Sequence, residues 1–340
     1  MSTQAEDRRG LFEALVADGR PLLVLTALAL ILSGGFVVFQ SAAGQFLPQD
    51  VEFLGMTAKD LCRVGQCRVV HFMFHDRVSF GGAIFAIGSL YLWLAEFPLR
   101  QRTAWAWWVF VISGLVGFGS FLTYVGYGYL DRWHAVATLL LLPCFGFGLW
   151  RSYQMLLPPR GVGSLLRPGV VAPWGSAYGV GRACLLFTAV ALVAGGLTIM
   201  GVGMTRVFVP QDLEFMGMSP AELRAISPRL VPLIAHDRAG FGGGLCATGV
   251  AVFFCVWCAT PSRSLWQVLC VAGAAGFGTA IAIHPIVGYL SFSHLAPAVG
   301  VAVVFCAGSG LCAKTMFGWE RHSGREAEAP DVRPGLRGTT

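Results

Sequence analysis

The chain has 340 residues and a net charge of +6; only 12% of its residues are charged, and its mean hydropathy is +0.66. A soluble domain carries about 25% charged residues, so this composition excludes a soluble globular enzyme and predicts an integral membrane protein in a lipid bilayer. The excess basic charge predicts no nucleic-acid partner, because basic residues gather in the cytoplasmic loops of membrane proteins.

The apolar segments predict an all-α membrane protein with eight transmembrane helices. A helix needs about 20 apolar residues to cross the hydrocarbon core. Eight stretches qualify in chain order: 21–41, 79–97, 104–126, 134–151, 183–204, 240–259, 265–287 and 295–313. One alternate set of loops, together with both ends of the chain, holds the excess of Lys and Arg. The sequence therefore predicts a multi-pass protein of the cell membrane with cytoplasmic N- and C-termini.

An internal repeat organises the chain. The segment 46–56 recurs as 208–218, and both copies contain Pro-Gln-Asp. His-Asp-Arg followed by Phe-Gly-Gly, Gly-Phe-Gly and Gly-Tyr-Leu each occur twice as well, and the offset between copies stays between 159 and 162 positions. Because each copy contains four spans, an even number, both copies have the same orientation in the membrane.

The repeat predicts two tandem, parallel-oriented four-helix bundles. The expected organisation is a cytoplasmic N-terminus (1–20), a first four-helix unit (21–156), a cytoplasmic linker (157–182), a second four-helix unit (183–315) and a disordered cytoplasmic tail (316–340). In each unit the long outer loop between the first and second spans carries helix-start signals after Pro-Gln-Asp. Thr57 to Asp60 resembles a capping box, and Ser219 with Glu222 is a better one. These signals predict short helices on the outer surface.

The ten cysteines divide by position. Eight lie within predicted spans, where a thiol behaves as a small apolar residue. Cys62 and Cys67 lie in the first outer loop. An oxidising outer compartment favours a disulfide between these two.

Four histidines form a repeated pattern at the outer side. His75 and His134 open the second and fourth helices of the first unit, and His236 and His294 do so in the second. In an up-down bundle these helices face each other diagonally, with axes roughly 11–14 Å apart. Two imidazoles can bridge that distance through one haem iron. The pattern predicts haem ligation by His75/His134 and His236/His294.

Other polar residues of the repeat have more than one interpretation. Arg77 and Arg238 follow the second-helix histidines and are candidates to hold haem propionates, since a guanidinium grips carboxylates bidentately. Asp50 and Asp212 are candidates to join the histidines in a non-haem metal site. A purely structural role for the His-Asp-Arg motif, as a helix cap paired with the loop, stays open. His71 and His284 have no counterpart in the other unit and are interpreted as structural.

The arrangement of these residues resembles the haem A synthase family. That family also has two tandem four-helix bundles with outer histidine pairs on helices 2 and 4 and on helices 6 and 8, and often a cysteine pair in the first outer loop. The matching residues are His75, His134, His236, His294, Cys62 and Cys67. The resemblance covers nearly the whole core in architecture, but the family's His-Arg pair stands here as His-Asp-Arg.

Two classes of function follow as hypotheses. The first is a haem-binding membrane redox or haem-modifying protein, with a quinol or a membrane redox complex as partner. The second is a non-enzymatic membrane protein, such as an assembly subunit or a transporter. The span centres hold almost no ionisable residues, which disfavours a transporter because ion and proton pathways need them.

Overall fold

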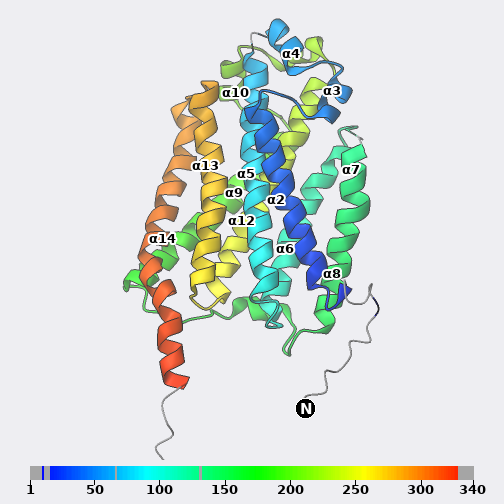
Figure 1. The fold of residues 1–340 in the computed structure, drawn as a ribbon. Helices are drawn as coiled ribbons and strands as arrows, with labels where there is room; N and C mark the ends of the chain where they lie inside the picture. The colour runs from blue at the N-terminus through cyan, green and yellow to red at the C-terminus, as the bar shows by residue number, and fades with distance from the viewer. Residues whose placement is uncertain (1–9, 11–15, 66, 130–131, 328–340) are drawn as a thin grey trace, which may run out of the picture.

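The structure is a computed structural model that describes residues 10, 16–65, 67–129 and 132–327, without the side chains of 319–327. All regular secondary structure in these ranges is helical. Eight helices are long and apolar enough to cross a membrane (Figure 1): α2 (Arg20–Ala42), α5 (Arg68–Glu96), α6 with the 3-10 turn η1 (Ala104–Val125), the continuous α7–η2–α8 (Arg132–Gln154), α9 (Ala177–Met204), α12 (Leu230–Cys258), α13 (Arg263–Val287) and α14 (Phe292–Gly318 within Phe292–Ala327).

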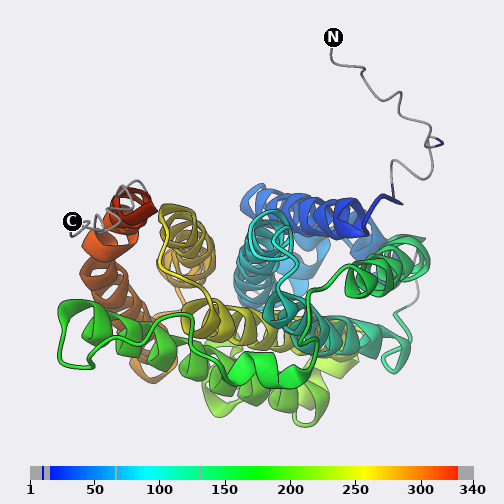
Figure 2. The same cartoon turned by 90° about the horizontal axis from the view of Figure 1, so that it is seen from below.

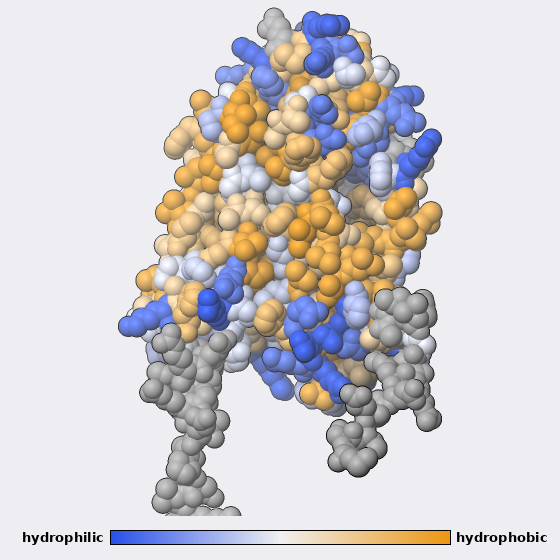
Figure 3. All heavy atoms as spheres, in the orientation of Figure 1, coloured by the Kyte–Doolittle hydropathy of each residue, from blue (hydrophilic) through white to orange (hydrophobic). Residues whose placement is uncertain are grey.

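The surface matches this assignment. An apolar band crosses the middle of the molecule, and hydrophilic residues gather at its two ends (Figure 3). Large apolar side chains such as Leu32, Phe39 and Leu139 are mostly exposed on this surface. Exposed apolar side chains are stable where lipid rather than water surrounds the helices. The prediction of an all-α integral membrane protein with eight spans is confirmed.

Two helix boundaries differ from the predicted spans for one reason. α5 begins at Arg68 rather than near 79, and α12 begins at Leu230 rather than near 240. Hydropathy placed the starts after the His-Asp-Arg motifs because charged residues interrupt an apolar run. His75 and His236 therefore lie about two turns inside their helices instead of opening them.

The C-terminal segment differs from its prediction as well. α14 continues to Ala327, so the first part of the predicted disordered tail is helical. Residues 328–340 lie outside the described residues, as does most of the predicted N-terminal segment.

Short helices cover one end of the molecule, as predicted. They are α3 (Pro48–Leu54), α4 (Ala58–Gly65), α10 (Pro210–Met216) and α11 (Pro220–Ile226), and we call this end the loop-helix end (Figure 1). Both predicted capping boxes form: Asp60 and Glu222 accept hydrogen bonds from the backbone N–H groups of Thr57 (3.0 Å) and Ser219 (2.7 Å). The predicted disulfide between Cys62 and Cys67 is present at the end of α4.

The two repeats interlock through their second helices. α5 packs against α13 as well as α12, and α12 packs against α6 as well as α9. α5 thus separates α12 from α13, and α12 separates α5 from α6. Each repeat is an open arc of four helices, closed into a five-helix ring by the second helix of the other repeat (Figure 2). α5 and α12 belong to both rings, and they are the most buried spans. Two separate four-helix bundles are therefore not confirmed.

The repeated Phe-Gly-Gly motif allows the helices of the two repeats to pack closely against each other. A Cβ on Gly82 would lie 2.7 Å from the carbonyl oxygen of Ala275 on α13, and one on Gly243 would overlap Cβ of Ser120 on α6. Small residues allow helix backbones to approach in this way. One glycine in each copy of the motif therefore contacts the third helix of the other repeat.

We expect Gly82→Ala to destabilise the protein, because a methyl group there must push α13 away from α5. Overpacking of this kind costs about 1–3 kcal/mol. Thermal unfolding of the purified protein in detergent measures the change. Gly278→Ala on α13 is the matched control: its Cβ would have nothing within 4 Å, and alanine favours a helix. Equal unfolding temperatures for the two variants would contradict the close packing.

Candidate functional site

Two buried arginines link the repeats by ion pairs. Arg77 on α5 pairs with Asp50 of its own repeat (2.7 Å) and with Asp237 on α12 (2.9 Å). Arg238 on α12 forms the corresponding pairs with Asp212 of its own repeat (2.7 Å) and with Asp76 on α5 (3.0 Å). Buried charges are tolerated when they are paired in this way. The partners of Arg77 and Arg238 are carboxylates of the protein itself, so the structure gives no support to their predicted role with haem propionates.

The predicted metal ligands Asp50 and Asp212 serve the fold. Each accepts a hydrogen bond from the backbone N–H that begins its short helix, from Leu47 (2.9 Å) and Val209 (2.8 Å) respectively. Each also pairs with an arginine and accepts a hydrogen bond from the tyrosine of a Gly-Tyr-Leu motif. These bonds occupy both carboxylates, and neither lies in the histidine cluster described below. The structure supports the structural interpretation of both residues.

Histidines meet across the repeats rather than within them. His134 on α7 and His236 on α12 place their Nε2 atoms 3.1 Å apart. His75 on α5 lies against His284 and His294, which belong to α13 and α14. The predicted neighbours His75/His134 and His236/His294 are thus re-paired. The physical reason is the insertion of α5 and α12 into each other's rings, which carries each second-helix histidine to the other repeat.

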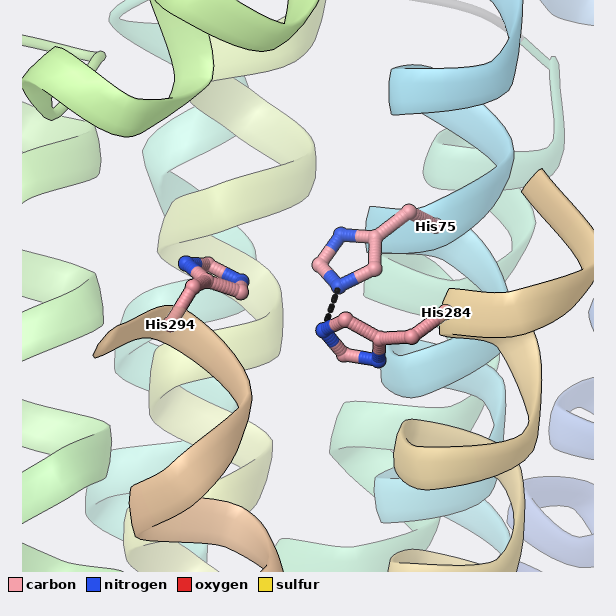
Figure 4. Close-up of side chains that lie close together, drawn as sticks. All are labelled: His75, His284 and His294. Atoms are coloured by element: carbon pink, nitrogen blue, oxygen red, sulfur yellow. Dashed lines mark hydrogen bonds between the residues drawn. The ribbon is translucent and has the colours of Figure 1, made fainter. Parts of the chain in front are cut away.

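Three histidines converge at one point. His75, His284 and His294 each offer one ring nitrogen, and these three atoms lie within 4.8 Å of one another (Figure 4). The His75 and His294 ring centroids are 5.3 Å apart, and those of His284 and His294 are 5.4 Å apart. His75 and His284 are buried, and His294 is half-buried. We call these three residues the histidine cluster.

The hydrogen bonds around the cluster determine which nitrogens carry lone pairs. His75 Nδ1 lies 3.0 Å from Oδ1 of Asp76, and His284 Nδ1 lies 2.7 Å from the carbonyl oxygen of Ala280. Both oxygens can only accept, so each Nδ1 carries the proton. In the neutral rings, each Nε2 then holds a lone pair, yet these two atoms face each other at 3.1 Å. A cation between them, either a proton or a metal ion, is needed to avoid repulsion.

The distances distinguish two kinds of metal site. With metal–nitrogen bonds of about 2.0–2.1 Å, two tetrahedral ligands lie about 3.3 Å apart, whereas ligands on opposite sides of a metal lie about 4.1 Å apart. The separation between His75 Nε2 and His284 Nε2 is 3.1 Å. This spacing is close to tetrahedral coordination and short for two axial ligands of a haem.

A chain of polar contacts supports the cluster from behind. It runs from Nδ1 of His75 to Nδ1 of His294. The residues between them are, in order, Asp76, Arg238, Asp212 and Tyr289. Burial and the adjacent Asp212 raise the pKa of Tyr289, so its hydroxyl stays protonated and donates to that carboxylate (2.8 Å). Such outer partners fix the orientation of metal-binding histidines.

The equivalent place in the other ring differs at two points. His134 and His236 correspond to His294 and His75, but Tyr124 stands where the repeat offset places His284. The Tyr124 ring packs 4.7 Å from that of His134, and its hydroxyl bonds to Thr138 (2.9 Å). The Nδ1 of His236 is buried without a hydrogen-bond partner among the described residues. The two sites have therefore diverged, and only one retains three histidines.

A cavity of about 480 Å³ extends from the histidine cluster between α5, α9, α12, α13 and α14. His75, His284 and His294 all line it, together with Arg238. The remaining walls are mainly aliphatic and aromatic. A metal ion held by the cluster would thus have a ligand-sized space beside it.

One member of the site was not expected. His284 was interpreted as structural because the other repeat has no histidine at that position. A signal did exist: it precedes Gly288-Tyr289 by the same spacing that separates Tyr124 from Gly128-Tyr129. His71, also interpreted as structural, lies half-buried on α5 and is not part of the cluster.

The fold and the site define an all-α integral membrane protein with eight spans and a histidine cluster at the loop-helix end. No protein-family model, curated protein or solved structure matches the chain.

Proposed function

We propose that this protein is a membrane metalloprotein that binds one divalent transition-metal ion through His75, His284 and His294. The observation that carries the proposal is the pair of facing Nε2 atoms, 3.1 Å apart, whose rings are both protonated at Nδ1. The third histidine favours a metal ion over a shared proton, because it brings another ring nitrogen within 4.8 Å of these two rings. Imidazole ligands suit zinc, iron, copper and nickel.

Three histidine ligands leave one coordination position for water or substrate, as in catalytic zinc sites. That position would face the cavity, which the three ligands line together. A metal ion there would polarise an oxygen-containing group or supply hydroxide near neutral pH. The proposed activity is therefore metal-assisted chemistry on a molecule held in the cavity.

The loop-helix end is proposed to face the outer side of the cell membrane. Two observations support this orientation. The Cys62–Cys67 disulfide lies at that end, and disulfides persist in oxidising compartments. The loops at the opposite end carry the excess of basic residues, which is typical of cytoplasmic loops.

Metal analysis tests the proposal. We expect purified wild-type protein, loaded with zinc and then desalted, to retain about one zinc ion per chain, and His75→Ala to retain almost none, because a two-histidine remnant is not a closed ligand set. His71→Ala is the matched control on the same helix. Size-exclusion profiles confirm that each variant is folded. If wild type retains no metal, the proposal fails, and a non-enzymatic role as an assembly subunit or transporter becomes the better hypothesis.

A second candidate is haem binding, in line with the resemblance to haem A synthases. The observation that favours it is that His75 and His294 line one cavity from two different helices. Such a protein would exchange electrons with a quinol or a membrane redox complex. A reduced-minus-oxidised spectrum of protein from haem-replete cells tests this candidate, and the absence of a Soret band would exclude it.

A further inference from the structure

The charged and imidazole groups that line the cavity beside the histidine cluster lie at one end of it. Its polar end is formed by the cluster with Arg238 and Gln211, near the loop-helix end. Away from this end its walls are largely apolar and include Ala83, Leu245 and Phe305. A molecule that fits this distribution has a polar head and an apolar body.

The cavity is also long. On α14 its lining extends from His294 to Phe305, and on α5 from His75 to Ala86. Eleven residues of helix correspond to about 16 Å. A length of this order suits an extended hydrocarbon chain.

Residues that line the cavity are exposed where α9 and α14 meet. At the end far from the cluster these helices touch: a Cβ on Gly181 would lie 2.9 Å from the carbonyl oxygen of Gly308. Towards the cluster, Thr198 on α9 and Pro297 on α14 line the cavity and are also exposed on the surface. Both residues lie within the membrane spans, at the level of the lipid.

We propose that the cavity binds a single-chain lipid, which enters from the bilayer between α9 and α14. Its chain lies along the apolar walls, and its oxygen-containing head reaches the histidine cluster. The head assignment rests on the proposed metal site, because the ion would be its binding partner. The chain assignment rests on the shape and polarity of the cavity alone.

Photo-crosslinking with a diazirine-bearing palmitic acid tests the chain assignment. Detergent-purified protein is irradiated with this probe, and the labelled residues are mapped by mass spectrometry. We expect labels on cavity-lining residues such as Val301 and Leu192. Val301→Trp obstructs the cavity and is expected to reduce labelling of the remaining lining residues about tenfold. Val303→Trp is the matched control, because Val303 is 63% exposed on the same helix and does not line the cavity.

Leu192→Trp, with Val190→Trp as its control, repeats the test from α9, so that misfolding of one variant does not decide the outcome. Labels confined to exposed residues, or equal labelling of the cavity lining in Val301→Trp and Val303→Trp, would overturn the chain assignment. Labelling of the cavity that is unchanged by zinc loading or removal would overturn the head assignment. Zinc retention is measured on the same samples: cavity labelling without zinc retention rejects the metal site and leaves the chain assignment supported.

Discussion

Replacing His284 by tyrosine is expected to remove the metal ion, and replacing Tyr124 by histidine to create a second metal site. The two substitutions exchange the side chains at one position where the sites in the two rings differ. His284→Tyr leaves two histidines where we propose three ligands, so retention of zinc is expected to fall from about one ion per chain to almost none. The hydroxyl of a neutral tyrosine does not replace an imidazole lone pair.

In Tyr124→His the new imidazole would stand beside His134 and His236, which already place two Nε2 atoms 3.1 Å apart. We expect zinc retention to approach two ions per chain. The new site should bind about 10–100-fold more weakly than the natural one, because the Nδ1 of His236 lacks the outer partner that His75 has in Asp76. Titration with a zinc-sensitive dye measures both affinities. Full zinc retention by His284→Tyr would refute the three-histidine assignment.

Arg77→Met is expected to be the most destabilising single substitution in the interface between the repeats. Methionine fills much of the space but leaves the carboxylates of Asp50 and Asp237 buried without their cation. Breaking a buried ion pair from one side costs about 3–5 kcal/mol. We therefore expect little folded protein after purification, or a strongly lowered unfolding temperature in detergent.

A second substitution that neutralises one of the two carboxylates is expected to restore part of the lost stability. Asp237→Asn added to Arg77→Met removes one of the two unpaired charges, so the double variant should unfold at a higher temperature than Arg77→Met alone. A double-mutant cycle isolates the pairwise energy from the loss of each side chain. If the Arg77→Met protein unfolded at the wild-type temperature, the ion pairs would have no role in stability.

Much of the architecture could be predicted because it depends on local patterns. Apolar stretches long enough to span a bilayer revealed all eight spans. The capping signals at Thr57 and Ser219 revealed helices in the loops, since capping involves residues three positions apart. The internal repeat showed which polar residues recur, and hence which end of the molecule carries the site. The disulfide could be predicted because Cys62 and Cys67 lie outside the spans.

The pairing of side chains could not be predicted in the same way. Which histidine meets His75 depends on α5 lying between α12 and α13, and this arrangement involves residues about 200 positions apart. A regular bundle, assumed for each unit, places the histidines of one repeat opposite each other. Similarly, Arg77 and Arg238 looked available for a ligand because the cross-repeat partners Asp237 and Asp76 are not visible from spacing. The repeat does not single out His284, because the corresponding residue of the first unit is Tyr124.

The interlocking of α5 and α12 bears on how the protein is assembled and on how the repeat evolved. In the folded protein α12 lies between α5 and α6, which have little contact with each other. The N-terminal half therefore cannot complete its own interior, and final assembly waits for the second half. An ancestral single unit would have met the same requirement by pairing with an identical copy. Fusion of two such units into one chain would allow the copies to differ, as they do at His284 and Tyr124.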